Sequence, residues 1–183
     1  MTRFTVPTRD TVSEANQALF DALQAKLGFV PDLYATFALS QNALGTYLAL
    51  QSAKSSINAK AREVVNLVVS QYNDCHYCLA AHTMLGRMNG FTDAQMIEIR
   101  KGTVSFDAKL DALAWLARNL VETRGHADAT AMDAFFAAGW SQENLVDVIV
   151  TVGDKIISNY LHAATDIPVD FPAAPPLELA EAA

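Results

Sequence analysis

The sequence predicts an all-α fold, and three features of the 183-residue chain lead to this prediction. Apolar side chains recur at helical spacing along most of the sequence. Capping residues and glycines mark where these stretches begin and end. Alternating strands joined by tight hairpin turns are not evident. The length suits one compact domain with its own core, which we expect to span residues 1–167.

The expected helices follow from these end signals. The first is expected to start at a capping box formed by Thr11 and Glu14 and to end at Gly28, since glycine readily takes the left-handed conformation at a helix C-terminus. Pro31 can open the next helix. The helices expected after the first cover residues 31–40, 42–55, 58–72, 75–89, 91–102, 106–124, 131–138 and 142–164.

Two of these helices are joined by a very short connection. Asn58 is expected to cap the helix over 58–72, and Asn73 and Asp74 to end it. Asp74 is then expected to cap the helix that begins at Cys75. Because the connection is so short, the two helices should pack antiparallel against each other.

The C-terminal part of the chain combines a long helix with a tail. The stretch over 142–164 is rich in Val and Ile, but Ser141 at its cap position and a length of about six turns favour a helix over strands. Residues 168–183 are rich in Pro and Ala and contain little that can pack alone. We expect this tail to be disordered or to lie across a neighbouring subunit.

The composition excludes several classes of partner. Hydrophobic residues make up 51% of the chain and charged residues 18%, against about 25% in ordinary soluble domains, so apolar area should remain for an interface between copies. The net charge of -7 disfavours nucleic acid and anionic lipid as partners. No apolar run approaches the about 18 residues of a spanning helix, and no signal-peptide pattern is evident. We therefore expect a cytoplasmic protein without nucleic-acid or membrane partners.

The segment from Glu63 to His82 contains the residues best suited to chemistry. Cys75 and Cys78, the only cysteines, are too close in sequence to be a secreted disulfide framework, so a redox or metal role is favoured. A CxxC pair at a helix start places thiols where free N–H groups stabilise thiolate. His82 lies on the same helical face and can accept a thiol proton, while Glu63 on the preceding helix can orient its ring.

Other readings of this segment remain open. The two cysteines can be inert core residues. Cys75, Cys78, His82 and Glu63 can also supply four zinc ligands, although three ligands from one helix converge poorly on a tetrahedral ion. A thioredoxin-like reading lacks the βαβ context that it needs. We expect neither a metal nor a cofactor.

Glu63, Cys75, Tyr77, Cys78 and His82 together resemble the signature of the AhpD-like alkylhydroperoxidase and carboxymuconolactone decarboxylase superfamily. The stretch LGFVPDLYATFALS, which precedes them, is similar to the peroxidase-related branch. The resemblance implies a compact AhpD-like helical domain that assembles into homo-oligomers, and we expect a dimer, trimer or hexamer. It also implies reduction of hydroperoxides through a disulfide cycle.

The resemblance also implies a role for each residue. Cys78 would be the peroxidatic thiol, Cys75 its resolving partner, and Glu63 with His82 a proton relay. Tyr77 stands where the best-studied pattern has histidine; it can donate a hydrogen bond and so support the site, but it cannot replace a histidine base at neutral pH. The thiol reductant is unknown, and in some AhpD members it is a lipoylated protein.

The sequence thus favours an alkylhydroperoxidase-like thiol peroxidase that acts on small or organic hydroperoxides. The alternative is a non-redox, carboxymuconolactone decarboxylase-like helical oligomer that binds a small metabolite, and a decarboxylase or lactone-processing enzyme is a weaker option. One physical conflict remains. The helix dipole favours Cys75 as the thiol of lower pKa, whereas the resemblance favours Cys78 as the nucleophile.

The low charge and high apolar content predict that the chain forms a stable homo-oligomer. Light scattering at micromolar concentration should give a multiple of the 19.8 kDa chain mass. A mass near that of one chain would contradict this prediction.

Overall fold

The computed structural model describes residues 4–177, and within this range all regular structure is helical. The predicted all-α fold is confirmed, and the expected helices are present with ends shifted by a few residues. None of the described helices is long and apolar enough to cross a membrane. The helices in chain order are η1 (Arg9–Thr11), α1 (Glu14–Leu27), α2 (Asp32–Phe37), α3 (Ala43–Ser52), α4 (Ala59–Tyr72), α5 (His76–Met88), α6 (Asp93–Arg100), α7 (Ala108–Glu122), α8 (Ala129–Ala137) and α9 (Gln142–Thr165).

The start of α1 differs from the expected capping box. Ser13, not Thr11, is the N-cap, and its side chain accepts a hydrogen bond from the backbone N–H of Asn16. Thr11 ends the short helix η1, where its hydroxyl is hydrogen-bonded to the backbone of Thr8. The local turn therefore uses the Thr11 side chain, and Ser13 becomes the first free capping residue. Gly28 ends α1 at φ +84°, as expected.

The chain divides into two compact units. The first contains residues up to Lys54 together with Tyr160–Asp170, and the second contains Ser55–Asn159 together with the segment from Phe171 onward. In the first unit, α1 and α2 both pack on α3. The expected single domain over 1–167 stays a prediction.

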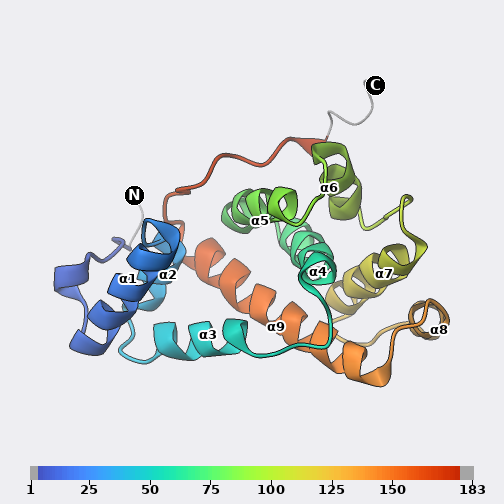
Figure 1. The fold of residues 1–183 in the computed structure, drawn as a ribbon, viewed down its shortest axis with the longest axis horizontal. Helices are drawn as coiled ribbons and strands as arrows, with labels where there is room; N and C mark the ends of the chain where they lie inside the picture. Colours follow the sequence, from blue (N-terminus) through green and yellow to red (C-terminus); the bar gives the residue numbers. More distant parts are fainter. Residues whose placement is uncertain (1–3, 178–183) are drawn as a thin grey trace. The chain divides into compact units, whose positions relative to one another are not determined.

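Helix α4 lies at the centre of the second unit. It packs against α5, α6 and α7, and α7 also packs against α8 (Figure 1). Val64, Val65, Leu67 and Val69 of α4 are all fully buried, so apolar neighbours surround most of the helix. A charged side chain on α4 must therefore find its partner inside the unit. Glu63 is such a side chain, since it is only 7% exposed.

The C-terminal segment after Asp170 packs on the second unit of its own chain. Phe171 makes an edge-to-face contact with Tyr77, with ring centroids 5.5 Å apart. Farther along, the guanidinium of Arg100 on α6 donates a hydrogen bond to the carbonyl oxygen of Pro175. Residues 178–183 of the expected tail lie outside the described residues.

One side of α9 is apolar and exposed. Its side chains there are Val146, Ile149, Val150 and Ile157, which are between 44% and 60% exposed. A homo-oligomer would bury such a surface, but the expected oligomer stays a prediction.

Shortening the fully buried Leu113 of α7 to alanine should destabilise the fold by about 2–5 kcal/mol, because the lost contacts leave a cavity beside α4. Met88→Ala is a matched control, since Met88 is 76% exposed and its loss should cost about 0.5 kcal/mol or less. Urea unfolding measures both changes. Equal midpoints for the two variants would contradict the assigned core.

Candidate functional site

A tight turn between α4 and α5 positions both cysteines. Asp74 adopts the left-handed conformation at φ +50°, and the N–H of Cys75 donates back to the carbonyl of Ser70 at 2.9 Å. Cys75 is therefore the N-cap of α5, and its sulfur accepts the N–H of Cys78 at 3.3 Å. The prediction that Asp74 caps this helix is wrong. The left-handed backbone of Asp74 reverses the chain, and this places Cys75, the next residue, at the cap position.

The two cysteine side chains are free thiols in direct contact. Their sulfur atoms lie 2.6 Å apart, and the residues are only 1% and 3% exposed for Cys75 and Cys78. The pair therefore needs no backbone rearrangement to reach bonding distance. Its burial limits access to small reagents.

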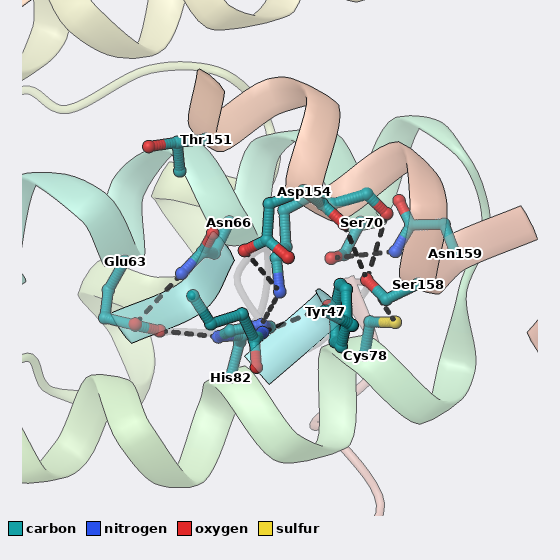
Figure 2. Close-up of polar contacts among 12 residues, drawn as sticks. Tyr47, Glu63, Asn66, Ser70, Cys78, His82, Thr151, Asp154, Ser158 and Asn159 are labelled. Atoms are coloured by element: carbon teal, nitrogen blue, oxygen red, sulfur yellow. Dashed lines mark hydrogen bonds and ion pairs between the residues drawn. The ribbon is translucent and has the colours of Figure 1, made fainter. Parts of the chain in front are cut away.

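A row of buried polar groups runs from α4 through α5 to α9. Glu63 Oε2 lies 2.8 Å from His82 Nδ1, and His82 Nε2 lies 3.0 Å from the ammonium nitrogen of Lys155. Asn66 donates a hydrogen bond to the other carboxylate oxygen of Glu63 at 3.0 Å. Asp154 lies 3.5 Å from the Lys155 ammonium. Figure 2 shows the Glu63 carboxylate directed toward the His82 ring and the Asn66 amide directed toward this carboxylate.

This arrangement occupies both ring nitrogens of His82. Nδ1 is held by Glu63 and Nε2 by Lys155, so neither nitrogen is left to take a proton directly from a thiol. The structure thus brings Glu63 and His82 together as the sequence suggested, but it inserts a lysine that the sequence reasoning missed. Burial opposes charge on Glu63, but the positive charge and hydrogen bond of His82 outweigh it and hold the pKa of the carboxyl below its ordinary value.

The two thiols have opposite pKa shifts. The thiol of Cys75 donates a hydrogen bond to Cys78, and together with the positive charge carried by the Lys155 and His82 pair this lowers the pKa of Cys78 to about 6 despite its burial. The same hydrogen bond, burial and the negative charge of Cys78 raise the pKa of Cys75. Of the two arguments from the sequence, the helix-dipole argument therefore predicts the wrong thiol as the more acidic.

Several polar residues of α9 complete the surroundings of the cysteines. Ser158 Oγ lies 3.9 Å from Cys78 Sγ and is hydrogen-bonded to the carbonyl of Lys155 (Figure 2). Asn159 contacts Ser70 at 3.4 Å and Asn73 at 2.9 Å, which ties α9 to the end of α4. These residues were not found from the sequence. The available signal was a run of polar residues on the side of α9 that also carries buried valines.

The remaining predicted residues lie at the edge of this site. Tyr77 is 2% exposed and packs its ring on Phe171. His76, adjacent to Cys75, is exposed beside Asp74. In residues 4–177, no group of three or more His, Cys, Asp or Glu side chains is arranged to hold a metal ion.

Comparisons with known proteins agree with this fold. Residues 38–118 match the sequence model of the Carboxymuconolactone decarboxylase family, a range that contains both cysteines, Glu63 and His82. No curated protein matches the chain in sequence.

Solved structures extend the likeness to almost the whole chain. A peroxidase-related protein from Silicibacter sp. TM1040 is 21% identical with a TM-score of 0.80, and the match covers 91% of each chain. An alkylhydroperoxidase AhpD core protein, also peroxidase-related, from Ralstonia eutropha JMP134 is 17% identical with a TM-score of 0.83 over 92% of each chain. The debrominase Bmp8 in complex with 2,3,4-tribromopyrrole is 15% identical with a TM-score of 0.74, over 93% of this chain and 94% of the debrominase. The chain therefore resembles the Carboxymuconolactone decarboxylase family in sequence over residues 38–118, and it shares the fold of these peroxidase-related proteins over almost its whole length.

Replacing Glu63 by glutamine should leave the fold intact and raise the pKa of the reactive thiol. The substitution keeps the side-chain volume but removes the negative charge that stabilises the cation formed by His82 and Lys155. The rate at which iodoacetamide alkylates this thiol at pH 7 should fall, because a higher pKa leaves less of the reactive thiolate. Iodoacetamide alkylation measured against pH reports the thiol pKa.

Glu143→Gln is the matched control, because Glu143 is an exposed glutamate in the first turn of α9. Its alkylation curve should coincide with that of the unaltered protein. If the Glu63→Gln curve coincides as well, Glu63 has no part in the site.

Proposed function

We propose that the protein is a thiol peroxidase that reduces small or organic hydroperoxides through a disulfide cycle of Cys78 and Cys75. One observation carries this proposal: two buried thiols are in direct contact beside the row of Glu63, His82 and Lys155, and the pKa of one of them is lowered to about 6. At neutral pH such a thiol is mainly thiolate, the form that attacks peroxides. The likeness to peroxidase-related proteins agrees with this chemistry.

The proposed cycle has two steps. The Cys78 thiolate attacks the outer peroxide oxygen, the O–O bond breaks, and the departing oxygen takes a proton to leave as alcohol or water. Cys78 is thereby oxidised to sulfenic acid. Cys75, whose sulfur is 2.6 Å away, then attacks the Cys78 sulfur, which releases water and forms the disulfide.

The cycle needs an external dithiol to reduce the disulfide again, and a lipoylated protein is one such donor. Only a small donor group can reach this pair, because the residues Cys75 and Cys78 are 1% and 3% exposed. A reducing, cytoplasmic location would keep both thiols available between turnovers. Assembly into a homo-oligomer is part of the same proposal, and the exposed apolar side of α9 is consistent with it.

Two other functions remain to be tested against this one. A non-redox oligomer that binds a small metabolite would have no use for the low pKa of Cys78. Reductive debromination is a second candidate, because a debrominase shares the fold. The two thiols can supply the two electrons that replace a carbon–bromine bond by a carbon–hydrogen bond, with release of bromide and formation of the disulfide.

Treatment of the reduced protein with hydrogen peroxide or cumene hydroperoxide should remove two free thiols per chain. Mass spectrometry should show the loss of two hydrogens, and the Cys75→Ser variant should instead stop at sulfenic acid. Because the thiolate is the reactive form, the rate should rise with pH through about 6 and level off above about 7.

Slow or absent thiol loss with both peroxides would overturn the peroxidase proposal. Thiol loss with bromide release on treatment with a brominated pyrrole, but not with peroxide, would favour the debrominase function. No thiol loss with any of these compounds would favour the non-redox alternative.

A further inference from the structure

Lys155 is a buried charge that the cycle described above does not use. The residue is 3% exposed and belongs to α9, which is otherwise anchored by buried valines such as Val148 and Val152. Burying an ammonium group is costly unless it is paired and hydrogen-bonded. Its neighbours are the His82 ring nitrogen at 3.0 Å and the Asp154 carboxylate at 3.5 Å.

We propose that Lys155 is the residue that exchanges a proton with the reacting groups at Cys78, while Glu63 and His82 act through it. Lys155 would stabilise the Cys78 thiolate and then protonate the oxygen that leaves the peroxide. The second role rests on the proposed peroxidase function, whereas the first does not.

The hydrogen bonds of His82 supply the first argument. Two nitrogen atoms at 3.0 Å can share a hydrogen bond only if one of them lacks a proton, so His82 and Lys155 together carry one mobile proton in this contact. The other ring nitrogen is held by Glu63. A proton that leaves or enters this row on the side of α9 must therefore pass through the lysine nitrogen.

The register of α5 against α9 supplies the second argument. Cys78 contacts Ser158, and His82, four residues later on α5, contacts Lys155, three residues earlier on α9. Residues three or four apart lie on the same face of a helix. One face of α9 therefore contacts both Cys78 and His82. On this face, Lys155 is the charged residue that contacts the His82 ring, and it lies three residues before Ser158, which contacts Cys78.

The charges around Lys155 come from three helices. α4 contributes Glu63, α5 contributes Cys78 and His82 with Cys75 at its cap, and α9 contributes Asp154. After the hydrogen bond from Cys75, the positive charge of Lys155 is the strongest attraction that lowers the pKa of Cys78. Asp154 competes for the same ammonium.

The peroxide step then balances without another reagent. The thiolate sulfur forms a bond to the outer peroxide oxygen and is oxidised to sulfenic acid, while the O–O bond breaks. The departing oxygen receives a proton from the Lys155 ammonium and leaves as alcohol or water. The proton released when the Cys78 thiol ionises returns the lysine to its charged form for the next turnover.

The test of the first role is a titration of thiolate ultraviolet absorbance in the reduced full-length protein. The Cys78 midpoint, about 6 in the unaltered chain, should rise to about 8 or above in Lys155→Met, which lowers the thiolate fraction at pH 7 about tenfold. Lys155→Arg keeps the positive charge, so most of the lowering of the Cys78 pKa should remain in this variant. Lys60→Met, at an exposed lysine of α4, should leave the midpoint unchanged.

Asp154→Asn provides a test of opposite sign. Removing this carboxylate leaves more of the ammonium charge for Cys78, so the Cys78 midpoint should fall. A purely structural role for Lys155 predicts an unchanged midpoint in this variant. If Lys155→Met does not fold, an Asp154→Asn midpoint that stays in place or rises, or an Lys155→Arg midpoint as high as 8, overturns the proposal. An unchanged midpoint in folded Lys155→Met overturns it directly.

The second role is tested with peroxide at pH 9.5, where Cys78 is thiolate in both proteins. Lys155→Met should still reduce peroxide about 10²- to 10⁴-fold more slowly, because the proton donor is missing. Equal rates would overturn this role. If the unaltered protein does not reduce peroxide at all, the proposed function fails, but the thiolate titration still decides the first role.

Discussion

The buried row of Glu63, His82 and Lys155 is the interaction on which the proposed chemistry depends. Each group is less than a tenth exposed, and each is satisfied by its neighbour on another helix. Replacing one partner by an apolar side chain would leave the others unpaired inside the unit, which is far more costly than removing an exposed ion pair, whereas a polar replacement such as Glu63→Gln keeps a hydrogen-bonding group in place. The row therefore fixes α4, α5 and α9 relative to one another at the point where the cysteines lie.

The two cysteines differ strongly although only two residues separate them. Cys75 is the helix cap and receives an N–H, but its own thiol hydrogen is donated to Cys78. A helix terminus is worth about 0.3–1 kcal/mol to a negative charge, which a direct hydrogen bond and nearby cations can exceed. Because Cys75 lies at the helix start, it donates the thiol hydrogen bond, and the Cys78 thiol that accepts this bond has the lower pKa.

Local signals in the sequence were sufficient for the fold and for part of the site. Asn58 capped α4 as expected, and the short connection brought Glu63 against His82. The place of Lys155 in the site depends on how α9 packs on α5, and no local pattern in the sequence specifies this packing. Its signal was a lysine seven residues after the buried Val148, at a position where the helical period predicts an apolar side chain. A charge at such a position indicates a buried partner.

The most direct test of the proposed site is to identify which of the two cysteines is the thiolate. The fully reduced protein is exposed briefly to a limiting amount of iodoacetamide at pH 7, and the labelled residue is then identified by peptide mass spectrometry. The opposite pKa shifts predict that nearly all of the label is on Cys78. Label mainly on Cys75, or equally on both cysteines, would contradict the assignment of the thiolate to Cys78 and, with it, the proposed role of the buried row.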